Sequence, residues 1–360
     1  MVSIVILNFN GANYTENCLR SLLQTMYPQF EIILIDNAST DRSFENISKL
    51  FGFNSSLILI KNQLNLGFAG GNNLGAKIAK GKYVVFLNND TEVCSDWLTE
   101  LVKVMESDPS IGAAQSKLLL FDKKTFDSSG DMVTVFGESF CRGKFEKDEG
   151  QYNKVEEVFA ARGATMIVRR DLFCEVGGFD EKFFLTCEDT DLSWRMRLAG
   201  SKIFYVPTSV VYHAVSASSK NSFQKINHSA KNKIMMIIKN YSLGSLVICL
   251  PFTAISDCLF LLASLVSLDK RPVALSTCRA IFWLVIHFKS IWQERLRVQN
   301  LTRKIPDEDL KKFMIHVSFL PFLVRWFFRN HQPYRNNFCA FINSQLSISK
   351  FAKDKSNDNI

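Results

Sequence analysis

The strongest candidates for chemistry in this sequence are carboxylates that directly follow apolar runs. Asp90 ends the segment Tyr83-Val-Val-Phe-Leu-Asn-Asn-Asp90, in which an apolar, strand-like run leads straight to a carboxylate. A hard divalent cation prefers oxygen ligands and is commonly held by one or two carboxylates together with substrate phosphates. An Asn-Asn-Asp sequence also forms plain turns and helix caps. Its position after a strand favours a metal site, and we expect Asp90 to bind Mg²⁺ or Mn²⁺.

A second acidic segment, Glu188-Asp-Thr-Asp-Leu-Ser-Trp-Arg195, opens a predicted helix over 188–198. It places three carboxylates within four positions, more than the preference of a helix N-terminus for negative charge usually supplies. A carboxylate in a cleft is suited to remove a proton from a hydroxyl group as a general base, although helix capping is the structural alternative. His213 follows another strand-like run and is a candidate nitrogen ligand, whereas a lone histidine is more often structural.

Two further polar segments have the composition to bind the rest of a phosphorylated ligand. Asp36 begins the sequence Asp-Asn-Ala-Ser-Thr-Asp41 after a strand-like run, where a carboxylate can accept hydrogen bonds from a base or ribose. Ser39 or Thr40 can also cap the next helix. The glycine-rich segment from Asn65 to Asn73 enters a helix, so its backbone N–H groups can approach phosphate or sugar oxygens. A plain glycine turn explains that segment equally well.

An alternation of strand-like and helix-like segments positions these residues. Strand patterns fall at 2–7, 31–35, 57–60 and 83–87, and helix patterns fall near 13–25, 41–51, 70–80 and 95–107. This rhythm predicts an α/β fold, a Rossmann-like, mostly parallel sheet with flanking helices, whose ligands bind beyond the carboxyl ends of the strands. Strands at 163–168 and 202–206 complete the pattern. The intervening residues 120–155 lack periodicity, and we expect a variable surface loop without assigned chemistry.

Charge is distributed unevenly along the 360 residues. The net charge is +8, yet residues 221–360 hold 20 Lys and Arg against 8 Asp and Glu, so the first 220 residues are net negative. The basic residues are interleaved with long apolar runs, which favours an anionic membrane surface over nucleic acid as a partner. Nine cysteines are scattered without a C-x-x-C pair, and a strand-like run starts at Val2 in place of a signal peptide. We therefore expect the front half to stay in the cytoplasm.

The sequence changes character after about residue 220, which predicts a catalytic domain over 1–220 and a basic, apolar helical region over 221–360. The run from Leu243 to Leu268 contains one charged residue, Asp257, and has the length of a spanning helix, although Pro251 interrupts it. A shorter apolar run covers 272–286. Basic residues flank both runs: Lys231, Lys233, Lys239, Lys270, Arg271, Lys289, Arg295 and Arg297. Charge on every flank favours helices in the membrane interface over spanning helices or a packed soluble subdomain. We expect the chain at the cytoplasmic face of the cell membrane, peripheral or shallowly inserted.

Together these segments resemble the family 2 inverting glycosyltransferases with the GT-A fold, particularly their rhamnosyltransferase-like branch. The resemblance covers roughly residues 1–220 and rests on the order of seven segments, none of which is specific alone. They are Val2-Ser-Ile-Val-Ile-Leu-Asn-Phe-Asn10, Ile35-Asp-Asn-Ala-Ser-Thr-Asp41, Asn65 to Asn73, Leu87-Asn-Asn-Asp90, Gly163-Ala-Thr-Met-Ile-Val-Arg-Arg170, Gly177-Gly-Phe-Asp180 and Glu188-Asp-Thr-Asp-Leu-Ser-Trp-Arg195.

The resemblance implies roles for particular residues. Asp36 would bind the nucleotide base, and Asp90 would be the last residue of a D-x-D-type metal-binding motif. Asp189 would be the catalytic base, supported by Glu188, and His213 would help to bind the metal or the diphosphate. The chain departs from many relatives in carrying asparagines directly before Asp90, so metal binding would rest on that carboxylate and on the diphosphate.

The resemblance also implies the partners. A nucleotide-diphosphate sugar would be the donor, and a lipid-linked saccharide or growing surface polysaccharide would be the acceptor, with inversion at the anomeric carbon. Gly163 and Ala164 would line the sugar pocket. Further residues expected to bind the donor are Asn8, Asn10, Asn65, Gly67, Asn72, Asn88, Asn89, Asp191 and Arg195. The alternatives are a catalytically inactive protein that binds a nucleotide sugar, and a nucleotidylyltransferase. Against the second, this chain lacks a glycine-rich phosphate loop with Arg or Lys after its first strand.

Overall fold

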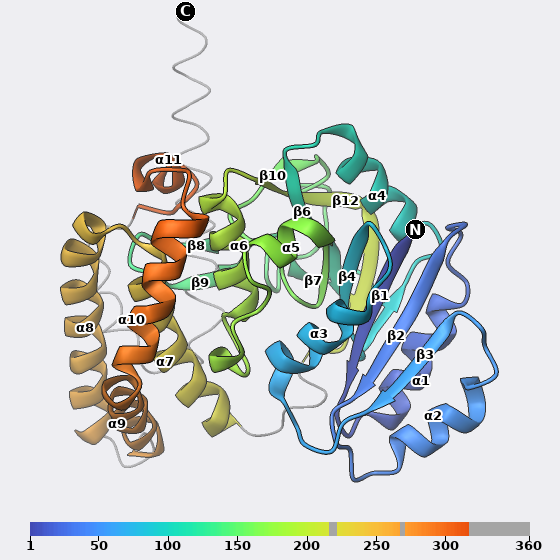
Figure 1. Cartoon of the computed structure of the whole chain (residues 1–360), viewed down its shortest axis with the longest axis horizontal. Helices are drawn as coiled ribbons and strands as arrows, with labels where there is room; N and C mark the ends of the chain where they lie inside the picture. Colours follow the sequence, from blue (N-terminus) through green and yellow to red (C-terminus); the bar gives the residue numbers. More distant parts are fainter. Residues whose placement is uncertain (216–221, 267–270, 317–360) are drawn as a thin grey trace, which may run out of the picture.

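The computed structural model describes residues 1–215, 222–266 and 271–316 (Figure 1). Four parallel strands form the first part of its large sheet: β1 (Val2–Asn8), β2 (Phe30–Asp36), β3 (Leu57–Lys61) and β4 (Tyr83–Asn88). β1 pairs with β2 and β4, in a register that sets Asn8 opposite Asp36 and Leu7 opposite Asn88. The polar residues at the ends of these strands therefore share one edge of the sheet, as the sequence predicts.

The rest of the sheet extends from β4 in the order β4-β11-β6-β12-β10. Strands β11 (Thr165–Arg169) and β6 (Ile111–Leu120) follow β4 with antiparallel pairing, and β12 (Lys202–His213) runs parallel to β6. Two short strands, β5 (Thr91–Val93) and β7 (Phe126–Ser128), pair with β12 and β6, and β10 (Glu156–Glu157) pairs with the outer side of β12. The long β12 delivers His213 to the same edge as Asp90, because His213 pairs with Thr91.

Helices cover both faces of the sheet. One face packs against α1 (Ala12–Leu22), α2 (Ser43–Phe51) and α4 (Trp97–Ser107), and the other against α3 (Gly67–Ile78), α5 (Arg170–Glu175) and α6 (Glu188–Leu198). Ile4 and Ile6 of β1 enter the first core and Val5 the second, as the alternation of side chains along a strand requires. Gly75 lets α3 approach closely, because an added Cβ would lie 2.3 Å from the Val5 side chain.

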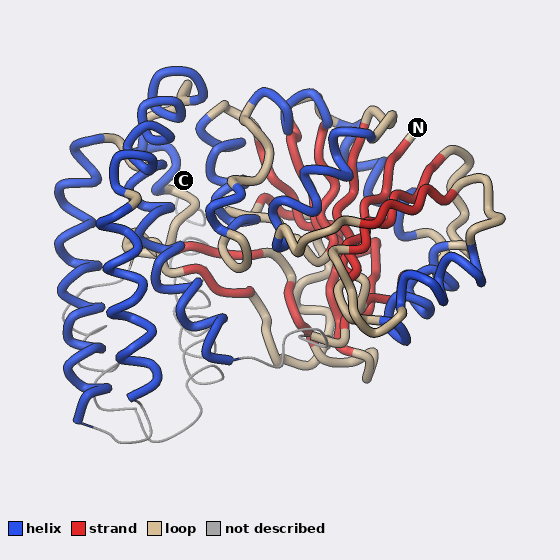
Figure 2. Tube along the Cα trace, turned by 60° about the horizontal axis from the view of Figure 1, so that its bottom comes forward, coloured by secondary structure: helices blue, strands red, loops and turns tan. Residues whose placement is uncertain are grey.

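Residues 120–155 are more ordered than the loop predicted from their lack of periodicity. Besides β7, they form a hairpin of β8 (Asp131–Val133) and β9 (Ser139–Cys141). Figure 2 shows this hairpin reaching from the sheet toward the C-terminal helices. The segment also contributes the buried charged residues Asp127, Asp131 and Lys144, to which the sequence pattern assigns no role.

The C-terminal helices form a layer beside the sheet (Figure 1). They are α7 (Ser222–Asn240), α8 (Leu243–Val266), α9 (Arg271–Ile286), α10 (Phe288–Arg297) and α11 (Asp307–Lys311), with a π-helical turn η3 (Val298–Thr302) before α11. A third core cluster joins this layer to the sheet domain: Trp194 of α6 packs edge-on against Tyr241 at 4.8 Å between ring centroids. The core is therefore continuous across residue 220, the predicted domain boundary.

None of the described helices is by itself both long enough and apolar enough to cross a bilayer. A pair of helical segments, Ala274–Ile286 and Phe288–Thr302, reaches the required length and hydropathy only when taken together, with a bend of 67° between them. Part of the apolar run that the sequence analysis placed at 243–268, and Lys270 beside it, lies outside the described residues.

Candidate active site

Asn8 and Asp36 form a buried polar network at the ends of β1 and β2. The Asn8 amide donates to Asp36 Oδ1 at 2.7 Å and to Ser43 Oγ at 2.8 Å, while Asn8 Oδ1 accepts from Thr15. Asn89 also donates to Asn8 Oδ1, at 3.2 Å. The Asp36 side chain is fully buried. Asp36 and Asn8 thus connect the ends of β1 and β2 through buried hydrogen bonds, and their predicted contact with the donor stays a prediction.

The other asparagines predicted to bind the donor lie around this network. Asn10 is exposed and its Oδ1 accepts from the backbone N–H of Thr40, which fixes the turn after β1. Asn65 accepts from the N–H of Gly67, where the backbone has φ +70° at the start of α3. Asn72 donates to the Phe68 carbonyl one turn earlier in α3. These contacts place the residues near the edge of the sheet that carries Asp36 and Asn8, and their predicted contact with the donor stays a prediction.

Asp90 and His213 come together as the sequence predicts, and the structure adds Asp127 of β7. His213 Nε2 lies 3.1 Å from Asp90 Oδ1, and His213 Nδ1 lies 2.8 Å from Asp127 Oδ2. The Asn88 amide is 3.3 Å from Nε2. The imidazole is buried between two carboxylates, which it joins across the sheet edge.

The charges around Asp127 are balanced by two cations. Lys144 Nζ lies 2.6 Å from Asp127 Oδ1, and Arg162 Nε lies 3.7 Å from Oδ2. Burial alone would raise the pKa of Asp127, but Arg162, His213 and Lys144 hold it well below its usual range. Burial alone would lower the pKa of His213, but Asp127 and Asp90 raise it. The residue at position 127 is therefore an anion that holds the ring of His213.

The chemistry of these side chains suits a divalent cation held mainly by its substrate. The described residues contain no group of three or more His, Cys, Asp and Glu side chains placed to hold a metal ion. One carboxylate and one imidazole do converge, which matches a cation that takes its remaining ligands from a diphosphate. A metal-binding histidine usually donates its second N–H to a carboxylate, as His213 can to Asp127. Asp90 and His213 would hold the cation.

Asp189 is half-buried at the start of α6 and faces the loop before β11. Its Oδ2 accepts from the N–H of Gly163 at 2.9 Å, and its Oδ1 accepts from the N–H of Thr190 at 2.7 Å. The carbonyl of Ala164 accepts from the N–H of Asn88 at 3.0 Å. Gly163 and Ala164 therefore connect the predicted catalytic base with the end of β4, where Asp90 follows.

Glu188 lies next to Asp189 but is buried. Burial raises the pKa of Glu188 well above its usual range, and the neighbouring charge of Asp189 raises it further. Its Oε2 has no hydrogen-bond partner among the described residues. A carboxyl group in this setting is favoured in its neutral form, so it can support Asp189 without adding a second negative charge.

The loop before α6 has a strained backbone. Phe184, Thr186 and Cys187 have φ values of +60°, +71° and +64°, in the left-handed region that side chains other than glycine rarely adopt. Each such residue costs roughly 1–3 kcal/mol and persists only where its surroundings hold it, and such strain clusters at active sites. Here the strain lies directly before Glu188 and Asp189.

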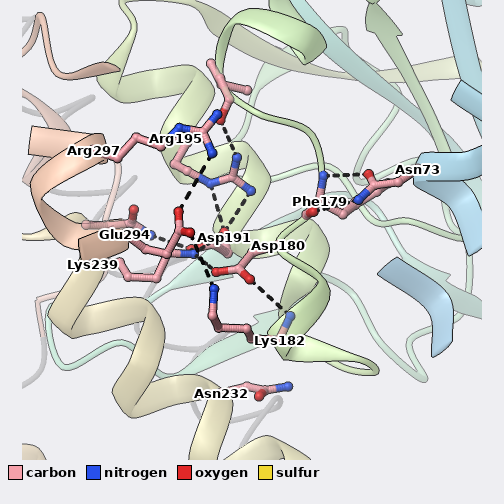
Figure 3. A network of polar contacts seen from close by, with 12 residues as sticks. Asn73, Phe179, Asp180, Lys182, Asp191, Arg195, Asn232, Lys239, Glu294 and Arg297 are labelled. Atoms are coloured by element: carbon pink, nitrogen blue, oxygen red, sulfur yellow. Dashed lines mark hydrogen bonds and ion pairs between the residues drawn. The ribbon is translucent and has the colours of Figure 1, made fainter. Parts of the chain in front are cut away.

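Asp191 and Arg195 have a structural setting that differs from the predicted donor contact. Arg195 Nε donates to Asp191 Oδ2 at 2.9 Å within α6, and Lys239 of α7 lies 3.2 Å from the same carboxylate (Figure 3). Both side chains are buried. They bind the helical layer to α6, so the three carboxylates of this helical turn have different surroundings, and the predicted donor contact of Asp191 and Arg195 stays a prediction.

A cavity of about 410 Å³ lies beside this network. Its walls include Arg195, Lys239, Asp180 and Arg297. Neither the predicted catalytic residues nor the predicted metal ligands line it. Figure 3 shows Asp180 between Lys239 and Lys182 at this place. The opposite charges are paired here, with Lys239 Nζ 2.6 Å from Asp180 Oδ2.

Sequence reasoning missed Asp127, Asp131, Lys144 and Arg162. Arg162 Nη1 lies 3.6 Å from Asp131 Oδ2, and although burial opposes it, Cys141 and the carboxylates of Asp127, Asp131 and Asp189 raise the pKa of Arg162 well above its usual range. Arg162 therefore lies near Asp127, which contacts His213, and also near Asp189, the predicted base. Asp127 and Asp131 lie four positions apart in a segment without strand or helix periodicity, so no sequence pattern predicts that they lie at the sheet edge.

Comparison with known proteins agrees with this geometry. Residues 3–177 match the sequence model of the family described as Glycosyl transferase family 2. The O-antigen biosynthesis protein RfbC of Myxococcus xanthus is 31% identical over 228 residues, which cover 61% of this chain and 18% of that protein. The first four curated relatives are matched over only 18% to 53% of their own lengths.

Two solved structures have a similar fold. GalNAc-T7 with UDP, GalNAc and Mn²⁺ aligns with a TM-score of 0.54 at 19% identity, covering 66% of this chain and 47% of that one. The mannosyltransferase PcManGT of Pyrobaculum calidifontis, with GDP-Man and Mn²⁺, aligns with a TM-score of 0.50 at 15% identity, covering 92% of this chain and 88% of that one. Residues 3–177 therefore match a glycosyl transferase family 2 domain, and the fold is of the α/β GT-A type with flanking helices.

Proposed function

We propose that this chain is an inverting glycosyltransferase that moves a sugar from a nucleotide-diphosphate donor to a hydroxyl group. The observation that carries the proposal is the arrangement around Gly163 and Ala164. Gly163 donates to Asp189, and Ala164 accepts from Asn88, two residues before Asp90. A candidate base and a candidate metal ligand thus lie on either side of one short loop at the sheet edge where GT-A domains bind their donors.

The proposed reaction is a single displacement. Asp189 accepts the proton of the acceptor hydroxyl, whose oxygen forms a bond to the anomeric carbon from the face opposite the diphosphate. The bond from that carbon to the diphosphate oxygen breaks, and the nucleoside diphosphate leaves with the electron pair. Configuration inverts. A divalent cation, when bound, supplies charge stabilisation to the leaving diphosphate.

The proposed acceptor is a lipid-linked saccharide or a surface polysaccharide precursor, and the proposed branch of the family is the rhamnosyltransferase-like one. The name of the Myxococcus xanthus relative, an O-antigen biosynthesis protein, supports this class of acceptor. The two similar solved structures hold UDP and GDP-Man, each with Mn²⁺, which supports a nucleotide donor and a cation.

We also propose that the helical layer lies on the cytoplasmic face of a membrane. Large apolar side chains are exposed on α8, α9 and α10; they include Leu243, Val247, Ile248, Ile255, Leu262, Leu275, Phe282, Val285, Ile286 and Phe288. An amphipathic surface of this kind binds a bilayer by burying its apolar side chains among the lipids.

The contribution of basic residues to this attachment is smaller than the sequence suggests. Lys231, Lys233 and Lys239 are buried, and Lys233 pairs with Glu138 and Asp257 at 2.7 Å each. Asp257, the charged residue within the apolar run, is thus neutralised inside the protein. Arg295 is also buried, whereas Lys289 and Arg297 are exposed. The proposal therefore rests mainly on apolar contact.

A donor screen tests the proposed reaction. The full chain is incubated with a panel of nucleotide sugars, Mn²⁺ and a bacterial lipid extract, and nucleoside diphosphate release is measured beside an Asp189→Asn control. One donor should give lipid-dependent release that the control lacks. Release equal to that of the control with every donor would reject the proposal, and tight donor binding without turnover would identify an inactive nucleotide-sugar-binding protein.

A further inference from the structure

The backbone of a loop directly before Asp189 makes hydrogen bonds both to the sheet domain and to the C-terminal helices. Residues 183–187 run from the end of η1 (Glu181–Phe183) to the start of α6 and include the three left-handed residues described above. From the sheet domain, the loop receives one backbone hydrogen bond, from the N–H of Phe68 to the carbonyl of Phe184 at 2.7 Å. The carbonyl of Cys187 accepts from the N–H of Asp191 at the start of α6, and the carbonyls of Phe183, Leu185 and Thr186 face α7.

A single side chain of α7 binds three of those carbonyls. The amide of Asn232 lies within hydrogen-bond distance of the carbonyl oxygens of Phe183 and Leu185, at 2.9 Å each, and of Thr186, at 2.7 Å. Asn232 is fully buried. An amide nitrogen has two hydrogens, so it satisfies these three acceptors by sharing them. Two of the three carbonyls belong to Leu185 and Thr186, at and beside the strained positions, so this amide contacts the backbone where the strain lies.

The orientation of the Asn232 amide follows from the same contacts. If its oxygen and nitrogen were exchanged, the oxygen would face three carbonyl oxygens without a hydrogen between them. In the observed orientation Oδ1 is buried without a hydrogen-bond partner among the described residues. A buried polar atom left unpaired destabilises the fold. The hydrogen bonds of the Asn232 nitrogen to the loop therefore come with an unpaired, buried Oδ1.

The neighbouring residues of α7 hold the chain on both sides of Asp189. Lys231 Nζ donates to the carbonyl of Lys182 at 2.6 Å, before the loop. Eight positions later on the same helix, Lys239 and Asn240 contact the carboxylate of Asp191, after Asp189. A spacing of eight residues is close to two helical turns, so these side chains lie along one face of α7. The base is thus held from α7 at both ends.

We propose that Asn232 is a positioning residue for the general base Asp189. It holds the strained loop in the conformation that turns the carboxylate of Asp189 toward Gly163 and the acceptor. The inference rests on the proposed function only for the role of Asp189. The helical layer, on this proposal, is part of the catalytic apparatus as well as its attachment to a surface.

Two substitutions test the proposal in the full-length protein. Asn232→Leu keeps the approximate volume of the side chain and removes its N–H donors, and Asn232→Ala removes both. Ile237→Ala is the matched control, because Ile237 is buried on the same helix but lies against Gly137 of the hairpin loop. Rates of transfer are measured below the unfolding temperature of each variant, together with hydrogen exchange of the amides of residues 184–189.

The expected result separates positioning from stability. Both Asn232 variants should lose at least tenfold in kcat with the donor KM changed less than twofold, and their loop amides should exchange faster. Ile237→Ala should lower the melting temperature but keep the wild-type kcat and loop exchange. Wild-type kcat in a folded Asn232→Leu variant, or an equal loss in Ile237→Ala, would overturn the proposal. If the wild-type protein transfers no sugar, the proposed function fails, and the exchange measurement alone then decides whether Asn232 holds the loop.

Discussion

Asp127 lies 2.8 Å from Nδ1 of His213, on the side of the ring opposite Asp90. Because Asp127 and Asp90 both raise the pKa of His213, a ring with both nitrogens protonated is favoured here, in which Nδ1–H donates to Asp127 and Nε2–H donates to Asp90; a bound cation would take the place of the Nε2 proton. Asp127 comes from β7 and His213 from the end of β12, 86 residues later, so both strands must pair with β6 before the ring is oriented.

Replacing Asp127 with asparagine should weaken cation binding. Asparagine keeps the shape but loses the charge that orients His213, and loss of such a supporting carboxylate typically lowers metal affinity 10- to 100-fold. Titration of Mn²⁺ in the presence of nucleoside diphosphate, followed by electron paramagnetic resonance, measures the effect. The control is Asp171→Asn, whose side chain is fully exposed on α5. Unchanged Mn²⁺ affinity in Asp127→Asn would show that His213 is not a ligand of the cation.

Asp189→Asn should lower the rate of transfer by at least about 10²-fold, the range expected for loss of a general base. Donor affinity should change little, because Asp189 contacts Gly163 and Thr190 rather than the predicted base-binding end of the site. Steady-state kinetics and calorimetric binding of the nucleoside diphosphate separate the two effects. Substantial turnover in this variant would transfer the role to Glu188.

Asp90→Ala, or a chelator added to the wild-type protein, should abolish transfer and weaken nucleoside diphosphate binding. The cation at Asp90 is expected to join protein and diphosphate, so removal of either partner breaks the same link. Binding is measured with and without EDTA, and re-addition of Mn²⁺ should restore only the wild-type protein. Full activity in excess EDTA would show that cationic side chains replace the metal.

Stability should depend on pH through Lys231. Burial lowers the pKa of Lys231 from 10.5 to about 8, with Asp180 acting in the opposite direction. Because the folded-state pKa is below the unfolded value, the unfolded chain binds more protons between about pH 8 and 10.5, and the free energy of unfolding should rise with pH over this range. Urea unfolding at several pH values should show a smaller rise in Lys231→Met than in wild type. The exposed Lys103→Met is the control, and an equal rise in all three proteins would contradict the expectation.

Full-length protein should sediment with anionic vesicles and remain bound in high salt. Salt screens surface charges but leaves the burial of apolar side chains largely unchanged, and three of the flanking lysines are already buried within the protein. A variant with Phe282→Asp and Val285→Asp, both on the exposed side of α9, should stay in the supernatant while keeping its fold. Protein that fails to sediment at low salt would leave no support for membrane attachment.

Much of the front half follows from the sequence because its physical causes are local. The strands at 2–8 and 83–88 are nearly continuous apolar runs, the helix starting at 188 opens with three carboxylates, and strand ends in a parallel sheet must share an edge. These patterns place Asp90 at the sheet edge, whereas the assignment of His213, 123 positions later, to the same site comes from the resemblance to the family 2 glycosyltransferases.

The remainder depends on contacts between distant segments that no local pattern records. Asp127 lies in an irregular segment, and its role appears only when β7 pairs with β6. Asp191 and Asp189 are two positions apart in the same motif, but one is buried against Lys239 and the other faces Gly163. The sequence alone favours a membrane-binding role for Lys231, Lys233 and Lys239, and only the packing of α7 shows that these three are buried.

The continuous core between α6 and α7 also sets the order in which the molecule can be completed during synthesis. At about 5–20 residues per second, a ribosome needs roughly 2–8 s to pass from the end of α6 at Leu198 to the end of α7 at Asn240. During that interval the sheet can form, yet Trp194 and Phe183 have no helix to cover them and Asp191 has no lysine opposite. The nascent chain thus exposes an apolar face next to the unfinished base-bearing loop, and this face is where a chaperone would be expected to bind.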